Sequence, residues 1–334
     1  MPITTAELKL FKAAQISNTA GSNGGRASYN EVVSAINNNL FPDVSQAERV
    51  AGVTHFRKAF FKNRNASNLT LYAPKLFVEN YSPADDAMYF HVGDHTNLQS
   101  ALTGTEDLYG SGKLDANVSA GAALLTVLIE DPTTQFFKNG QKIRVSDRAT
   151  LAGAGNEEFV TINAAPSIAG SVVTLSITPA LQNGYTAAST RVANVYEPSD
   201  IVASVTNVVV STAGSGDYNA DTTKPIIVPN VGGVYDDWTI TFTSGSAFTC
   251  VGAREGSVAG GSTASDYSPN NPATSTPFFT VQSLGFTGTW ASGDTLTFRT
   301  VPAHAPVWVK RVVPAGAGAY AGNKAVIAID GETA

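Results

Sequence analysis

Alternation of apolar and polar residues over short segments is the feature that most constrains the fold of this chain. Between Phe136 and Tyr196 it occurs in four segments, bounded by Gly, Asn, Asp or Pro: FFKNGQKIRVSD, GNEEFVTI, SVVTLSITPALQNGY and TRVANVY. A period of two indicates half-buried strands joined by tight turns. The stretch therefore predicts a small β-module that presents surfaces, and no catalytic constellation accompanies it.

Segments of the same kind predict strands in most of the remaining chain. The three tryptophans, Trp238, Trp290 and Trp308, lie within such segments and are expected in the core. The predicted strands are HFRKAFFKNRN, LTLYAPKLFVENYS, MYFHVG, IVASVTNVVVST, PIIVPNV, DWTITFTSGSAFTCVG, FFTVQSLGF, DTLTFRTV, PVWVKRVV and KAVIAID.

Helices are predicted only near the N-terminus. Residues 4–16 have apolar residues near helical spacing after a capping threonine. In residues 28–40, Ser28 precedes Glu31 by three positions, the spacing of a capping box, and an apolar stripe follows. The word SQAERVAG is expected to add one further turn, closed by Gly52.

These patterns predict a mainly β fold with short N-terminal helices, followed by sandwich-like or barrel-like β-modules with a small inserted β-module. The length of 334 residues allows roughly two to three domains. The expected division is an N-terminal arm, 1–27, a main β-rich domain with an N-terminal helix, 28–116 and 197–334, and the inserted module, 117–196. Residues 254–277 are long and poor in apolar residues, so they are expected to be a second arm, ordered by a partner.

Charged residues make up 14% of the chain, against about 25% in ordinary soluble domains. A surface covered by neighbouring copies has this composition, and so does a monomeric β-sandwich with an uncharged polar surface. The net charge is −6, and the densest basic cluster is Arg57, Lys58, Lys62 and Arg64. Because phenylalanines interrupt this cluster, we expect solvated alternate positions of one strand, and no direct nucleic-acid binding.

Cys250 is the only cysteine, so the chain has no internal disulfide and no cysteine-based zinc site. The first residues, MPITTAELKLFK, lack the apolar run and cleavage site of a signal peptide. No run of about 18 apolar residues is present, so no transmembrane helix is expected. We therefore expect a protein that is compatible with a reducing cytoplasm and makes no membrane contact.

The residues that most invite a chemical interpretation are explained better by structure. His91, Asp94 and His95 are metal-ligand types, but on a strand the two histidines would lie roughly 13 Å apart. Asp236 and Asp237 are adjacent, so in a strand they face opposite ways and form no catalytic pair. The glycine-rich segment NGGR lacks the glycine spacing of a phosphate-binding loop. We predict no catalytic residue, no metal and no cofactor.

Four short sequence segments between residues 23 and 65 form a distinctive set: NGGR, NNLFPDV, AERVAG and FRKAFFK. Longer words follow in LTLYAPKLFVENYSPADDAMYF, VYDDWTITFTSGSAFTCVGAREGSV and PVWVKRVVPAGA. With these segments the chain resembles a virion structural protein family of tailed bacteriophages. The resemblance rests on the amino-acid sequence of several separate segments, and these contain no catalytic signature.

The resemblance implies a component of a virus particle and no enzymatic activity. Its partners would be copies of itself and other virion structural proteins, and it would be made in the host cytoplasm and reside in the virion. The first hypothesis is a tail protein of the tube, sheath or baseplate region, assembling into a ring or helical array through β contacts between subunits. The alternatives are a capsid decoration or head–tail joining protein, and a carbohydrate-binding or hydrolytic protein of the virion surface.

For an assembling role, edge strands and arms would bind neighbouring copies. Apolar contacts would come from Phe60, Phe61, Tyr72 and Tyr81. The alternative for each of these four side chains is a place in the core of the single chain.

Overall fold

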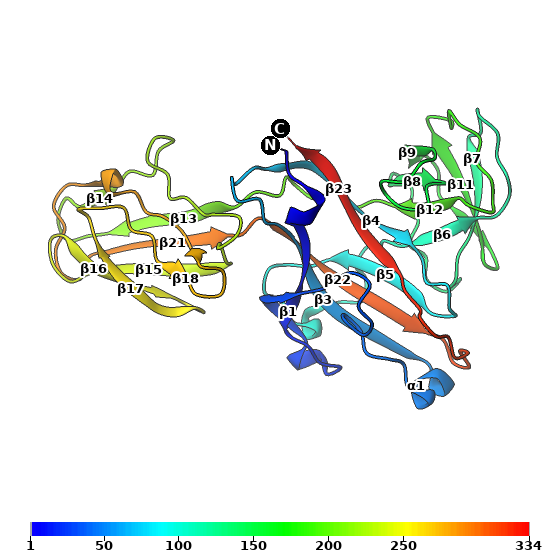
Figure 1. Cartoon of the computed structure of the whole chain (residues 1–334), viewed down its shortest axis with the longest axis horizontal. Coiled ribbons are helices and arrows are strands. Elements are labelled where there is room, and N and C mark those ends of the chain that lie inside the picture. The colour runs from blue at the N-terminus through cyan, green and yellow to red at the C-terminus, as the bar shows by residue number, and fades with distance from the viewer. Residues whose placement is uncertain (1, 334) are drawn as a thin grey trace.

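A computed structural model describes residues 2–333, and it consists mainly of β-strands arranged in three bodies (Figure 1). A central sheet lies between a closed barrel and a second sheet, here called the distal sheet. The prediction of a mainly β fold with barrel-like parts is confirmed. The single α-helix of the described part is α1 (Gln46–Ala51), with short 3₁₀ turns η1 (Thr5–Glu7), η2 (Ala20–Ser22), η3 (Gln99–Ala101) and η4 (Ser283–Gly285). Within residues 2–333, no helix is long and apolar enough to cross a membrane.

The central sheet is antiparallel, with the strand order β2-β1-β3-β22-β5. A two-stranded ribbon, β4 with β23, packs against it and contributes side chains to two cores. Leu76 and Val78 of β4 join the core of the central sheet, whereas Phe77 faces the barrel side. The bounds are β1 (Leu8–Gln15), β2 (Gly24–Glu31), β3 (Val53–Asn63), β4 (Leu71–Asn80), β5 (Ala87–Val92), β22 (His304–Val313) and β23 (Val326–Thr333).

The barrel is built from six strands in the order β11-β7-β6-β12-β8-β9, and it closes where Ile177 pairs with Ile162. Its core also takes in Ala87 and Tyr89 of β5, so an apolar contact holds it against the central sheet. The strands predicted between Phe136 and Tyr196 are confirmed. The bounds are β6 (Ser111–Leu114), β7 (Leu124–Leu128), β8 (Lys142–Ser146), β9 (Glu157–Ile162), β11 (Val172–Thr178) and β12 (Arg191–Asn194), with β10 (Ser167–Ala169) added beside β11.

The distal sheet is antiparallel, with the strand order β13-β21-β15-β16-β17. Trp238 and Trp290 lie in its core at 0% and 4% exposure, and Trp308 is equally buried in the central sheet, as predicted. The bounds are β13 (Ser204–Ser211), β15 (Asp236–Phe242), β16 (Ala247–Gly252), β17 (Gly256–Ser262) and β21 (Thr295–Val301), with small ribbons β14 (Asp217–Tyr218)–β20 (Phe286–Thr287) and β18 (Asn270–Asn271)–β19 (Thr276–Pro277).

The predicted helix at 28–40 is wrong, because its signals serve strand pairing instead. The Ser28 hydroxyl donates to the backbone oxygen of Lys12 in β1 at 2.9 Å, and Glu31 pairs with Lys9 at 2.9 Å. Both side chains thus bind the neighbouring strand rather than a helix terminus. The predicted turn at SQAERVAG is confirmed as α1, which Gly52 ends with φ 77°.

The predicted helix at 4–16 is also wrong, although its first turn exists. Thr4 and Glu7 make the predicted capping contacts around the single turn η1. The chain then enters β1, which pairs with β3 from Leu8 to Lys12. Strand pairing therefore outweighs the weak local preference for helix.

Neither predicted arm extends away from the chain. Residues 2–27 supply β1 and the start of β2, and residues 254–277 supply β17 and the β18–β19 ribbon. The low apolar content of 254–277 agrees with its exposure, since no residue of β17 is buried. The predicted insertion, 117–196, covers β7 to β12, while β6 also belongs to the barrel.

The basic cluster of β3 is not solvated as predicted. Arg57 and Lys58 are only 4% and 2% exposed, because loops cover both faces of this central strand. The Arg57 guanidinium donates to the backbone oxygen of Ser17 at 3.0 Å and to the side chain of Asn18 at 2.7 Å. The Lys58 ammonium donates to the side chain of Asn97 at 2.7 Å. These buried cations are therefore structural groups that fasten the covering loops.

Candidate functional site

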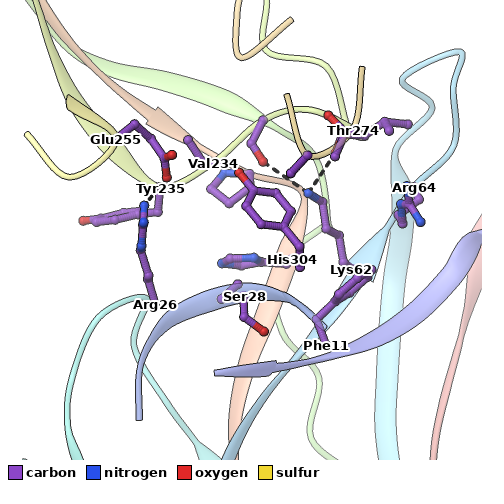
Figure 2. Close-up of a pocket in the computed structure, with 16 residues that line it drawn as sticks. Phe11, Arg26, Ser28, Lys62, Arg64, Val234, Tyr235, Glu255, Thr274 and His304 are labelled. Carbon is purple, nitrogen blue, oxygen red and sulfur yellow. Dashed lines mark hydrogen bonds and ion pairs between the residues drawn. The ribbon is translucent and has the colours of Figure 1, made fainter. Parts of the chain in front are cut away.

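A cavity of about 160 Å³ lies where the central sheet meets the distal sheet, and we call it the joint cavity (Figure 2). Sites for drug-sized ligands have roughly 300–1,000 Å³, so this cavity suits only a small ligand. One side is lined by residues of the central sheet and by neighbours of its strands β3 and β22. The other side is lined by loops of the distal sheet. The lining residues are Phe11, Arg26, Ala27, Ser28, Tyr29, Lys62, Arg64, Val231, Gly233, Val234, Tyr235, Glu255, Ala273, Thr274, Pro302 and His304.

Lys62, near the end of β3, crosses the boundary between the two sheets. Its ammonium donates to the backbone oxygens of Val231 and Gly233, at 3.1 and 3.2 Å, in the segment leading to β15 (Figure 2). Burial, with repulsion from Arg64 added, lowers the pKa of Lys62 to about 8. The amine therefore remains mostly protonated at neutral pH, in contact with carbonyl oxygens but with no carboxylate.

The cavity carries an excess of positive charge in an acidic protein. Arg26, Lys62 and Arg64 line it together with one carboxylate, Glu255, which is engaged in an ion pair with Arg26. The Arg64 guanidinium lies over the ring of Phe11, 5.7 Å from its centroid. Among residues 2–333, neither Lys62 nor Arg64 forms an ion pair with a carboxylate.

His304, the first residue of β22, is 92% buried at the wall of the cavity, given its exposed fraction of 8%. Its Nε2 lies 2.8 Å from Nδ1 of His95, whose ring stacks on Tyr235 of the distal sheet at 4.5 Å between centroids. Burial, followed by the charges of His95 and Lys62, holds the pKa of His304 well below its ordinary range. The ring is therefore neutral, and its Nδ1 has no hydrogen-bond partner within residues 2–333.

Polar contacts dominate the joint around this cavity. The backbone N–H of Asn230 donates to the side chain of Asn68 at 2.9 Å, and its side chain donates to the backbone oxygen of Leu69 at 3.1 Å. Asn271 donates to the Tyr29 hydroxyl at 3.1 Å. One partly buried apolar residue, Ala203, packs against the cores of both sheets. Joints of this polar type permit relative motion of the parts they connect.

The four residues predicted for an interface divide into two pairs. Phe60 and Phe61 are 0% and 6% exposed, so their side chains belong to the core of the single chain and are not on its surface. Tyr72 in β4 is 42% exposed, and Tyr81 is half-buried. An interface role therefore stays a prediction for the two tyrosines only.

The metal-type residues of HVGDH serve three separate purposes. The Nδ1 atom of His91 lies 3.1 Å from the backbone oxygen of Val92, and His95 pairs with His304. Asp94 accepts the backbone N–H of Thr96 at 2.6 Å, a contact that closes a turn. No group of three or more His, Cys, Asp or Glu suited to a metal occurs in residues 2–333.

Sequence reasoning missed the residues that meet in the joint cavity. Arg26 stands within the glycine-rich segment NGGR, Lys62 was predicted as a solvated strand position, and His304 was assigned to no site. Glu255 gave no signal at all, because it lies over two hundred positions from its partner Arg26. Basic residues spaced along predicted strands were the only available clue.

A second feature of the surface is β13, an edge strand of the distal sheet. Val208 and Val209 are 37% and 55% exposed, and the strand contains no charged residue and no proline. A bulge interrupts its pairing with β21 at Asn207, after which Val209 to Ser211 pair in register with Thr297 to Thr295. The outer edge of the strand therefore offers unpaired backbone groups beside exposed valines.

Comparison with protein-family models, with curated proteins and with solved structures gave no match.

Proposed function

We propose that this chain is a structural component of a tailed-bacteriophage particle, a tail protein that assembles with copies of itself through the edges of its sheets. The proposal rests on the resemblance of several sequence segments and on one observation of the structure, the unprotected edge strand β13. In this role the protein acts by docking, and it transforms no substrate.

Edge strands of soluble proteins are normally protected against pairing with other chains. Charged side chains, prolines, bulges or covering segments supply the protection. Strand β13 has only the bulge at Asn207, and the regularly paired run from Val209 to Ser211 lies beyond it. An exposed, uncharged valine run of this kind suits the addition of a strand from another copy.

A ring or a helical array needs two different surfaces on each subunit, since a single self-complementary surface closes into a dimer. The distal sheet has two different edges, β13 and β17, and neither strand contains a charged residue. Contact between unlike edges of neighbouring subunits would extend the sheet from copy to copy. This arrangement supports the proposed array.

The test is the assembly state of the purified full chain. We expect mass photometry over a range of concentrations to show multimers, and negative-stain electron microscopy to show rings or tubes. Val209→Lys places a charge on the edge of β13 and should leave a folded monomer. A wild-type chain that stays monomeric at every concentration would refute self-assembly.

Val251→Lys is the matched control. Val251 is 43% exposed, similar to Val209, but it lies in β16, which has a paired strand on each side. The same substitution there adds the same charge without blocking an edge. If both variants lose assembly equally, an apolar face and not the β13 edge carries the contact.

A further inference from the structure

The joint cavity contains features that the proposed assembly role does not use. Three cations line it with a single carboxylate, and two of these cations, Lys62 and Arg64, have no carboxylate partner within residues 2–333. His304, which is 8% exposed, lines the same cavity.

We propose that the joint cavity is a binding site for a small oxyanion, held by the charges of Lys62 and Arg64. The inference does not depend on the particle role, and its failure would leave that proposal unchanged. The probes are inorganic phosphate and acetate, which represent the tetrahedral and the planar members of the class.

Size limits the ligand to a few atoms. A cavity of about 150 Å³ admits a molecule as large as benzene, so the 160 Å³ of the joint cavity holds one phosphate or one short carboxylate. Lys62 and His304 reach it from the central sheet, and the Thr274 side chain lines it from the distal sheet (Figure 2). A bound anion would therefore contact both sheets and fix the polar joint between them.

Isothermal titration calorimetry of the full chain measures the affinity, with sodium chloride at equal ionic strength as the background. We expect saturable binding of phosphate, acetate or both, and their ratio identifies the preferred member of the class. Lys62→Met and Arg64→Gln should each weaken binding by about tenfold or more, because each removes one charge-assisted contact. Lys12→Met is the control, since Lys12 follows Phe11 in β1 and strand alternation turns it away from the cavity.

Imidazole nuclear magnetic resonance provides a readout independent of affinity. The chain has four histidines, and a His304→Gln variant assigns the signal of interest. Saturating phosphate or acetate should shift the ring signals of His304, because His304 lines the cavity. Binding no stronger than that of chloride, or an equal loss in Lys12→Met and Lys62→Met, would overturn the proposal.

Discussion

Two neighbouring aspartates at the start of β15 test how burial sets the contribution of a carboxylate to the free energy of unfolding. Asp236 is 0% exposed, and it accepts the backbone N–H of Glu255 at 2.8 Å and that of Arg254 at 3.0 Å. These bonds hold the turn between β16 and β17. Asp237 faces the opposite way and pairs with the Arg299 guanidinium through two bonds, at 2.7 and 3.0 Å.

The same substitution should therefore have very different effects. Besides a local bond from the backbone N–H of Asp237 at 2.9 Å, Asp236→Ala removes the two charge-assisted hydrogen bonds that hold the turn. At about 1.5 kcal/mol for each of these two, the free energy of unfolding should fall by about 3 kcal/mol. This energy is at the low end of the usual range for hydrogen bonds to a charged group, and we use it because Arg254 is exposed. Asp237 has a side chain 44% exposed, and an exposed ion pair contributes about 0–1 kcal/mol. Asp237→Ala should thus cost less than a third as much.

Urea unfolding followed by tryptophan fluorescence is the assay, since Trp238 and Trp290 both report on the distal core. Hydrogen exchange should also quicken at Arg254 and Glu255 in Asp236→Ala only. Equal losses of stability in the two variants, or a larger loss in Asp237→Ala, would refute the reasoning from burial.

Three further predictions concern single groups. Thr300→Val leaves the indole N–H of Trp238 without the acceptor that it contacts at 2.9 Å, and urea unfolding should show a loss of about 1–3 kcal/mol. Lys62 has a pKa of about 8 in the folded chain, below its ordinary value of 10.5, so between these values the unfolded chain holds the extra proton and stability should rise with pH. Lys62→Met should flatten that rise in urea unfolding at pH 8, 9 and 10, measured without phosphate. Burial raises the pKa of Cys250 to about 11, so a thiol reagent should label it only after unfolding, and prompt labelling of the native chain would contradict this.

The strands of the barrel and of the distal sheet were predictable because their signal is local. In β15, for example, Trp238, Ile240 and Phe242 alternate with polar residues, and all three are buried. Because one face of such a strand lies in the core and the other in solvent, apolar and polar residues alternate along its sequence. Turn residues then mark the ends of each strand.

The helix prediction for the N-terminal segment was wrong because the local sequence signals fit both a helix and a strand. Ser28 and Glu31 satisfy a capping box in sequence, yet in space they bind Lys12 and Lys9 of β1. The real capping box, Ser45 with Glu48, precedes a helix of six residues. Both patterns look alike along the chain, and only pairing with a distant strand decides between them.

The joint cavity was unpredictable for a related reason. Its basic residues come from β2, from β3 and from Arg64 just after β3, and its carboxylate comes from the turn before β17. Charges along a strand indicate a solvated face unless a second body covers that face. Nothing in the sequence near Lys62 shows that the distal sheet lies over it.

The two bodies attached to the central sheet differ in how they are fastened. The barrel core is continuous with Ala87 and Tyr89 of β5, and loss of that contact would expose apolar surface. The distal sheet meets the central sheet mainly through Lys62, the Arg26–Glu255 ion pair and amide side chains, whose polar groups water can also satisfy. Separation at the polar joint therefore costs less than separation at the apolar one. In the proposed assembly, the distal sheet would bind the neighbouring copy through β13, and it is also the body attached to the central sheet by the more polar joint (Figure 1).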